Sequence, residues 1–487
     1  MKHATQRTHP KNRWLHSLVL VIFSFIAAAS TFQPQASNPV WSKAIDITNG
    51  AGRNQRTPGV MACDAYQNLH IFFADQAEEG AAIFYRNDAS GTLSFPNDVV
   101  RVQDPRVYNL RVAISPHDDT VHLTWVNLAA NGVMYYSTAP LYRAGDATAW
   151  TKPIVMAASV NNSDVAVDPD GGLHLVYSVA RDEGISGEVF HQVSTDSGMN
   201  WSDPELVFSR TFTEPSFVMP WMDIDQKGRI HLAISMRSYD YGVASEVGYI
   251  RTLDDGATWS EYRMVQETGT EWQGVAYIDV YAFGEDEIHI TWHDPRRMHI
   301  YSMDGGNTWS QPDEIIVMGA AFGGPNELAM DSSGTLHVVT AISYGVYHST
   351  WENQRWGAAS MVDNQDNDPH GQNLVVCQGN QLHVVYWDRI GELTVWYSTR
   401  QVNAPHLERK PIPQPENVSL NQPVNDENPT GLLPTPTSNN IRETLAAEVP
   451  PTPGTTRMTL TKLLSGVVPS LLLIVVVIIL VVAKVRR

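Results

Sequence analysis

Arginine, carboxylate and aromatic residues recur in this sequence beside short apolar runs, where loops are expected to begin or end. An arginine guanidinium can hold a carboxylate through two parallel hydrogen bonds, so arginine-rich loops favour recognition of an anionic group. The enrichment stands out because the chain is acidic, with a net charge of −19. The residues collected from these loops are Arg53, Arg56, Asp75, Arg111, Arg181, Asp182, Arg237, Tyr239, Asp240, Glu271, Trp272, His293, Asp294, Arg296, Arg297, Glu327, Tyr344, Asp388 and Arg389.

Seven histidines occupy one repeated position, and histidine is a common metal ligand. Each follows an aliphatic residue and heads an apolar run, as in Leu69-His70-Ile71. The histidines are His70, His122, His174, His231, His289, His337 and His383, with spacings of 52, 52, 57, 58, 48 and 46 residues. Because each would lie in a different repeat, they would be too far apart to share one ion. We expect them to pack and to form hydrogen bonds within their repeats.

Each histidine belongs to a repeat of short strand-like segments. A period of this length, built from short strands, is typical of a β-propeller with one four-stranded blade per repeat. The last repeat has only three such segments and ends near Thr399, whereas Trp41–Ile47 resembles the outermost strands of other repeats. We therefore predict an all-β fold of seven four-stranded blades. The N-terminal strand would complete the last blade and remove its open edge.

A second pattern marks the turn before the fourth strand in three repeats. It reads hydroxyl residue, any residue, Asp, any residue, Gly, any residue, Thr or Asn, Trp, in Ser194–Trp201, Thr252–Trp259 and Ser302–Trp309. The Asp carboxylate can accept bonds from N–H groups of its own turn, Gly suits a positive φ, and Trp buries a large ring. The pattern resembles the Asp-box, or bacterial neuraminidase repeat, of the sialidase superfamily, where the motif is structural. Sialidases have six blades, so a six-bladed ring is the alternative to seven.

The resemblance also implies a catalytic site. Sialidases bind the sialic acid carboxylate with three arginines and use a tyrosine nucleophile assisted by a glutamate, with an aspartate as acid/base; the tyrosine is an exception to paired-carboxylate glycoside hydrolysis. Arg56 stands in Gln55-Arg56-Thr57-Pro58, where the family has Phe/Tyr-Arg-Ile-Pro, although the aromatic residue and the isoleucine are absent here. Asp75 follows the second strand of the first blade, about where the family's acid/base is expected. Loop position alone suggests Arg237 and Arg296 as the other arginines, Tyr344 as the nucleophile and Glu271 as its helper.

The sequence supports two classes of function. The first is an exo-glycosidase of sialidase type, which predicts that the three arginines converge above a Tyr–Glu pair. The second is a non-catalytic propeller that binds glycans or proteins, with scattered arginines and a mouth lined by Trp221, Trp272 and Tyr239. In this second case the loop arginines are solvated ion-pair partners, and Asp75 is one of several Asp or Asn residues that cap the second strand. Propellers host many functions, so the fold does not decide between the two.

The two cysteines, Cys63 and Cys377, each end an inner strand, one in the first repeat and one in the last. These repeats would be neighbours in a closed ring. An exported protein can form disulfides, but a shift of one residue in either strand would turn the side chains apart. A disulfide that fixes ring closure and a pair of buried thiols are both open.

The two ends of the chain predict export and a membrane anchor. Residues 1–30 combine a basic start, an apolar run and small residues at Ala27–Ser30, as in a cleavable signal peptide; an uncleaved signal anchor is the alternative. Leu463–Ala483 is an apolar stretch of 21 residues, long enough to cross a bilayer, and the basic tail 484–487 should stay cytoplasmic. Between the propeller, 40–403, and this helix, residues 404–461 contain eleven prolines and read as an extended stalk.

These features define the expected partners. We expect an extracellular glycan, either a sialoside or another anionic sugar, or a surface protein as the ligand, and the membrane as the attachment site of the C-terminal helix. The acidic charge argues against nucleic acid as a partner. We expect a monomer, and no His, Cys or carboxylate cluster shows metal-ligand spacing, so neither a metal nor another cofactor is predicted.

Overall fold

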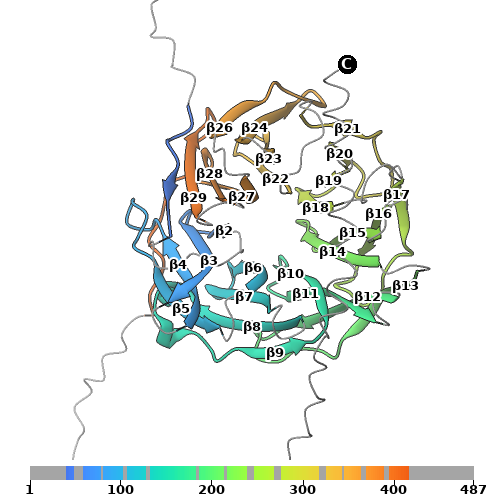
Figure 1. Cartoon of the computed structure of the whole chain (residues 1–487), viewed down its shortest axis with the longest axis horizontal. Helices are drawn as coiled ribbons and strands as arrows, with labels where there is room; N and C mark the ends of the chain where they lie inside the picture. Colours follow the sequence, from blue (N-terminus) through green and yellow to red (C-terminus); the bar gives the residue numbers. More distant parts are fainter. Residues whose placement is uncertain are drawn as a thin grey trace, which may run out of the picture. The chain divides into compact units, whose positions relative to one another are not determined.

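The computed structural model describes residues 40–48, 59–77, 80–102, 107–127, 132–181, 186–212, 216–238, 246–267, 276–294, 296–316, 325–342, 345–363, 369–388 and 394–415. Within these ranges the strands form seven antiparallel sheets, and Figure 1 shows these sheets arranged in a ring around a central axis. The prediction of seven blades is therefore confirmed. None of the described residues forms a helix long and apolar enough to cross a membrane, and the predicted span 463–483 lies outside them.

The blades follow one another along the chain, and in each the first strand lies innermost. Blade 1 contains β2 (Val60–Cys63), β3 (Leu69–Ala77), β4 (Gly80–Asn87) and β5 (Asn97–Val102). Blade 2 contains β6 (Val107–Ser115), β7 (Thr120–Asn127), β8 (Val133–Pro140) and β9 (Ile154–Ala157), with the short helices η2 (Leu141–Arg143) and η3 (Ala147–Ala149) before its last strand. Blade 3 contains β10 (Val160–Val167), β11 (Leu173–Arg181), β12 (Ser186–Ser194) and β13 (Glu205–Thr211).

The remaining blades repeat this order. Blade 4 contains β14 (Ser216–Ile224), β15 (Ile230–Ser238), β16 (Glu246–Thr252) and β17 (Arg263–Glu267). Blade 5 contains β18 (Ala276–Phe283), β19 (Glu287–His293), β20 (Arg297–Ser302) and β21 (Asp313–Glu314). Blade 6 contains β22 (Asn326–Met330), β23 (Leu336–Ile342), β24 (Gly345–Glu352), β25 (Arg355–Trp356) and β26 (Ser360–Asp363). Blade 7 contains β27 (Pro369–Cys377), β28 (Gln381–Asp388), β29 (Val395–Gln401) and the N-terminal β1 (Ile45–Asp46).

The hydrophobic core is divided among the spaces between blades. Seven clusters of buried apolar residues lie between successive blades, and the cluster containing Ile47 and Phe73 joins blade 7 to blade 1. Each blade thus buries both faces against its neighbours, which explains the nearly continuous apolar runs of the second strands. A blade removed from the ring would expose two such faces to water.

The ring closes between blades 7 and 1, as predicted. Ile45 and Asp46 pair with Tyr397 and Trp396, so β1 supplies the outer strand of blade 7. Cys63 and Cys377 form a disulfide, with Cα atoms 5.6 Å apart. Of the two alternatives that the sequence leaves open, the structure therefore has the disulfide and not a pair of buried thiols. Two non-contiguous parts of the chain are therefore joined at the seam both by strand pairing and covalently.

Residues 404–415, the first part of the predicted stalk, lie against the propeller. Leu407 donates its N–H to the carbonyl of Gln378 at 2.9 Å, and Lys410 donates to the carbonyl of Tyr66 at 2.8 Å. These contacts cross from blade 7 to blade 1, so this segment spans the seam where the ring closes. We name residues 404–415 the seam strap. The rest of the predicted stalk lies outside the described residues.

The seven histidines have the packing role predicted for them. All are buried, and each Nδ1 lies 2.6–3.0 Å from a tyrosine hydroxyl or histidine nitrogen on the third strand of the same blade. In five blades Nε2 contacts a carboxylate near the start of the histidine strand, at 2.9–3.1 Å. The partners, in chain order, are Tyr85, Tyr136, His191, Tyr249, His299, His348 and Tyr397, with the carboxylates Asp64, Asp168, Asp225, Glu287 and Asp331.

The Asp-box turns extend these hydrogen-bonded units to the neighbouring blade. In blade 4, Asp254 accepts bonds from the N–H and hydroxyl of Thr258 at 2.8 and 2.7 Å. Trp259 then packs edge-on against His191 of blade 3, with ring centroids 5.3 Å apart. The Asp-boxes of blades 3 and 5 contact blades 2 and 4 in the same way. The motif is therefore a joint between blades.

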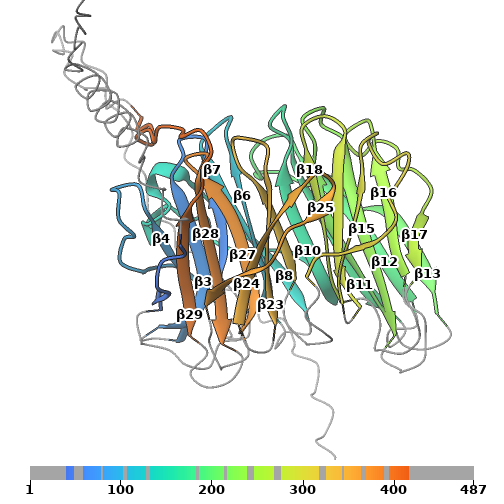
Figure 2. The ribbon, with the colours of Figure 1, turned by 90° about the horizontal axis from the view of Figure 1, so that it is seen from above.

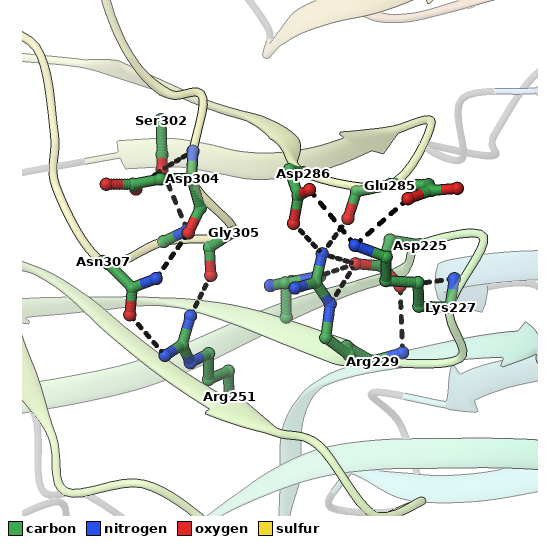
Figure 3. A network of polar contacts seen from close by, with 12 residues as sticks. Asp225, Lys227, Arg229, Arg251, Glu285, Asp286, Ser302, Asp304, Gly305 and Asn307 are labelled. Atoms are coloured by element: carbon green, nitrogen blue, oxygen red, sulfur yellow. Dashed lines mark hydrogen bonds and ion pairs between the residues drawn. The ribbon is translucent and has the colours of Figure 1, made fainter.

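Charged residues reinforce the same face between blades 4 and 5, as Figure 3 shows. Arg229 donates to Asp225 in its own blade at 2.6 Å and to Asp286 of blade 5 at 3.0 Å. Arg251 donates to Asn307 in the Asp-box of blade 5 at 2.7 Å. Because these guanidinium groups already bind protein oxygens, this network serves to hold the blades together.

The two faces of the ring differ. The antiparallel order puts the Asp-box turns at the same end as the turns between first and second strands, and the inner strands begin at the opposite end. Figure 2 shows the strands from the side, running between these two faces. The end where the inner strands begin is called the mouth below.

Candidate functional site

A cavity of about 220 Å³ lies at the mouth of the channel, and all seven blades contribute to it. It is called the mouth cavity, and it is lined by Gly59, Val60, Tyr108, Asn109, Arg111, Asn162, Trp221, Tyr277, Asp279, Pro325, Glu327, His370, Gly371, Gln372, Asn373 and Trp387. A second cavity of about 320 Å³, the inner cavity, shares Val60, Arg111, Trp221, Asp279, Glu327 and Asn373 with it and adds Asp164, Asp223 and Tyr281. The shared residues form a layer between the two spaces.

Irregularities in the inner strands shape the mouth cavity. The pairing register of the first two strands shifts near the mouth end in blades 2, 3, 5 and 7. Asn109, Tyr277 and Gly371 lie at three of these shifts with φ of 50, 50 and 55°. A positive φ is uncommon for an aromatic residue such as Tyr277. Bulges of this kind re-aim side chains and are frequent beside functional sites.

Arg111 is the arginine of the mouth cavity among the described residues. Its Nε lies 3.5 Å from Asp164 Oδ1, beyond the usual length of a hydrogen bond. Within the described part of the chain, Nε is buried and has no hydrogen-bond partner. A buried donor left without an acceptor is costly, so the hydrogen bonding of the Arg111 guanidinium is incomplete within the described residues.

Arg181 and Arg297, two other arginines of the loop set, have protein partners. Arg297 is buried and donates to Thr340 at 2.9 Å and to the carbonyl of Ala341 at 2.6 Å, which joins blade 5 to blade 6. Arg181 forms an ion pair with Glu188. These groups support the prediction that several loop arginines are ion-pair or structural partners.

Carboxyl groups surround Arg111 in the shared layer. Glu327 accepts from Asn373 Nδ2 at 3.0 Å and lies 3.5 Å from the Tyr281 hydroxyl. Burial raises the pKa of Glu327 to about 7, with Arg111 opposing the shift. Burial and the neighbouring Glu327 carboxylate raise the pKa of Asp279 well above its ordinary range. The layer therefore holds protons on some carboxyl groups near neutral pH.

Aromatic rings provide the apolar part of the wall. Tyr108 and Tyr277 are 40% and 37% exposed, whereas Trp221 and Trp387 are each 9% exposed. The Trp387 and His370 rings lie with centroids 6.3 Å apart. Pockets with a largely apolar wall and a few convergent polar groups are the usual sites for small ligands. Of the three aromatic residues predicted at the mouth, Trp221 lines it, and Trp272 and Tyr239 lie outside the described residues.

The predicted catalytic residues are only partly described. Asp75 lies two residues before the end of β3 and is 4% exposed, and burial raises its pKa to about 6, but it does not line either cavity. Arg296 is exposed, with Nε 3.5 Å from Asp294, and also lies outside both cavity walls. Arg237 belongs to β15, and its side chain is not described. The structure thus does not bring Asp75 and Arg296 together, and Arg56, Glu271 and Tyr344 lie outside the described residues.

Several residues of the cavity were not distinguished by the sequence. Arg111 and Glu327 were among the loop residues but had no assigned role, while Tyr108, Tyr277 and Asp279 were not collected. Arg111 and Asp279 each follow a register shift of an inner strand, and no pattern in the sequence marks these shifts. Among the described residues, no group of three or more His, Cys, Asp or Glu side chains is arranged to hold a metal ion.

Comparison with known proteins adds a family and a fold. Residues 141–339 match the family described as BNR repeat-like domain. No curated protein matches the sequence. An ulvan lyase of polysaccharide lyase family PL25 has a similar fold, with a TM-score of 0.52 and 12% identity over 74% of this chain and 95% of that one. The NanB sialidase from Streptococcus pneumoniae has a TM-score of 0.43 and 11% identity over 77% of this chain and 72% of that one.

At such low identity these structures concern the fold alone. The likeness to BNR-repeat proteins depends instead on the matched repeat model, on three Asp-box turns with their internal hydrogen bonds, and on the ring of blades that these turns join. Residues 141–339 carry BNR-type repeats, and the described residues of the chain form a seven-bladed β-propeller.

Proposed function

We propose that this propeller binds an acidic saccharide in the mouth cavity and that Arg111 receives the carboxylate of the sugar. The observation that carries the proposal is the buried Nε of Arg111, which has no acceptor among the described residues. A guanidinium matches a carboxylate through two parallel N–H donors. The nearest protein carboxylate, Asp164, lies at 3.5 Å and leaves this capacity for a ligand.

The size and lining of the cavity support a sugar as the ligand. Tyr108 and Tyr277 offer partly exposed rings to the apolar face of a pyranose, while Gln372 Oε1, which has no hydrogen-bond partner among the described residues, is an acceptor for a hydroxyl. The volume of about 220 Å³ is smaller than the roughly 300–1,000 Å³ typical of pockets for drug-sized ligands. One terminal sugar unit therefore suits it better than an internal stretch of polymer.

The more specific proposal is hydrolysis of a terminal α-sialoside. It is supported by the Tyr281–Glu327 contact of 3.5 Å in the wall of the cavities, since a Tyr–Glu pair is expected of a sialidase site. The alternative is a non-catalytic binding propeller. It is supported by an aromatic-lined mouth in which Arg111 stands as the one arginine of the described lining. Of the two, binding is the function that the described geometry supports best.

We also propose that the propeller is monomeric and lies outside the cell. In this proposal residues 1–30 are cleaved as a signal peptide, and a helix at 463–483 anchors the protein in the membrane. The Cys63–Cys377 disulfide supports an oxidising compartment, where such bonds persist. The direct measurement is protease protection in intact cells. Loss of the propeller with retention of a C-terminal tag is expected, and a protected propeller would contradict this location.

The test of ligand class uses calorimetry on the full-length protein in detergent. The probes are the methyl α-glycoside of N-acetylneuraminic acid and methyl β-D-glucuronide, and release of a fluorogenic aglycone from an α-sialoside reports hydrolysis. Arg111→Ala should weaken binding by about 10–100-fold, as expected for loss of charged hydrogen bonds. Arg355→Ala, at an exposed position of β25, is the matched control and should bind like wild type. Equal effects of the two substitutions would refute the proposal, and binding without turnover would exclude the sialidase form.

A further inference from the structure

Resting on the proposed function, we infer that capture of the sugar carboxylate is coupled to uptake of one proton by the Asp279–Glu327 carboxyl pair. The consequence is that the mouth cavity binds acidic saccharides more tightly as the pH falls, while neutral saccharides bind with no such dependence. The inference starts from the charges that meet around Arg111.

Arg111 is outnumbered by acidic groups. Asp279 and Glu327 line both cavities with it, and Asp164 and Asp223 line the inner cavity. An arriving ligand carboxylate would add a fifth acidic group beside a single guanidinium. Neighbouring carboxyl groups that are buried away from water disfavour simultaneous ionisation. When the ligand carboxylate arrives, one of the protein carboxyl groups should therefore take up a proton.

Asp279 and Glu327 are the pair best placed to take it. Asp164 accepts from the Met222 N–H at 3.1 Å and Asp223 accepts from the Ala282 N–H at 2.7 Å, so each already holds a bond between blades. Burial raises the pKa of both groups, that of Asp223 to about 7, but neither lines the mouth cavity. Glu327 keeps an oxygen near the Tyr281 hydroxyl and lies in the wall of the mouth cavity itself. Both contacts that Glu327 accepts from neighbouring blades, from Asn373 and from Tyr281, use Oε2, so a proton on Oε1 relieves repulsion and leaves them in place.

Other titratable groups face the pair from the surrounding inner strands. They are Tyr108 and Arg111 on β6, Asp164 on β10, Asp223 on β14, Tyr277 and Tyr281 on β18 and His370 on β27. Burial raises the pKa of Glu327 to about 7. Burial, together with the negative charge of Glu327, raises the pKa of Asp279 well above its ordinary value. The proton is therefore bound below neutral pH and lost above it, and ligand binding weakens as it is lost.

The size of the effect follows from one linked proton. If the free pair titrates near pH 7 and the ligand-bound pair holds its proton to higher pH, the dissociation constant rises by about tenfold between pH 6 and pH 8. The experiment titrates full-length protein in detergent with methyl β-D-glucuronide and with the methyl α-glycoside of N-acetylneuraminic acid at pH 6, 7 and 8. Repeating it at pH 8 in buffers of different ionisation enthalpy should give an uptake of about one proton per ligand. The methyl esters of the same sugars, which carry no charge, should show neither effect.

Substitutions assign the proton to its site. Glu327→Gln should bind at pH 8 about as tightly as wild type at pH 6, with proton uptake near zero, and Asp279→Asn should act in the same direction. His370→Gln is the control, because a protonated histidine would also attract an anion at low pH. It should keep the tenfold dependence.

The outcomes separate the two proposals. Binding of the acidic sugars that does not change with pH, or a dependence removed by His370→Gln and kept in Glu327→Gln, would overturn the proton coupling while the proposed function stands. No binding of either acidic sugar at any pH would overturn both.

Discussion

Gly256 in the Asp-box of blade 4 offers a sharp test of the claim that these turns join neighbouring blades. Its φ is +91°, and a Cβ atom at this position would lie 2.4 Å from Cε1 and 2.8 Å from Nδ1 of His191. His191 in turn lies 3.0 Å from the repeat histidine His174 and packs against Trp259. A methyl group must therefore displace a ring that connects blade 3 to blade 4.

The cost of Gly256→Ala has two parts. A positive φ costs an alanine about 1–2 kcal/mol, and forcing a methyl group into a filled space costs about 1–3 kcal/mol more. Gly284→Ala is the matched control, since Gly284 has φ of +62° but no atom within 4 Å of the added Cβ. The control should lose only the first part.

Urea unfolding followed by tryptophan fluorescence measures the difference. We expect Gly256→Ala to lower the free energy of unfolding by about 1–3 kcal/mol more than Gly284→Ala, with equal slopes of the transitions. Equal destabilisation by the two substitutions would refute the reasoning, because the added Cβ atom meets His191 at position 256 and has no atom within 4 Å at position 284.

Three further predictions concern the seam of the ring and the buried histidines. Arg409→Ala removes the guanidinium that donates to the carbonyl of Asp88 at 2.7 Å, and it should lower the free energy of unfolding by about 1–3 kcal/mol in the same urea assay; no change would mean that the seam strap does not stabilise the ring. Reduction of Cys63–Cys377, which are 314 residues apart in sequence, should cost about 3–5 kcal/mol and lower the melting temperature in calorimetry, and an unchanged melting temperature would contradict a role in closure. Burial lowers the pKa of His122 to about 4, so its imidazole nitrogens should show no titration above pH 5 by NMR, and a midpoint near 6.5 would contradict its burial as a neutral group.

Much of the fold could be predicted because the same pattern of strands recurs in each of the seven repeats. Leu69-His70 and its six equivalents mark the second strand of every blade, and the segment around Ile45 is recognisable as the strand that the last repeat lacks. The cysteine pair could be placed at the seam but not bonded by sequence alone, because the bond depends on the register of two strands far apart in the chain. The end of the propeller was harder to predict. The proline-rich composition after Ala404 hides the contacts of Leu407 and Lys410.

The candidate site was less predictable, for a physical reason. An alternating strand pattern assigns side chains to faces by counting in twos, but a bulge changes the count. Between Ala276 and Asp279 the register shifts, and this shift places Tyr277 and Asp279 in the cavity wall. Arg111 follows a similar shift in β6. A site assembled from the ends of seven inner strands also depends on ring geometry, which no local pattern encodes.

The central claim is that Arg111 receives the carboxylate of an acidic saccharide at the mouth. A crystal structure of the protein with the tighter-binding of the two acidic methyl glycosides tests it most directly. The account predicts the sugar in the mouth cavity, with a carboxylate oxygen within about 3 Å of a guanidinium nitrogen of Arg111 and a ring of the sugar against Tyr108 or Tyr277. A sugar bound elsewhere on the propeller, or bound in the mouth with its carboxylate turned away from Arg111, would contradict the account.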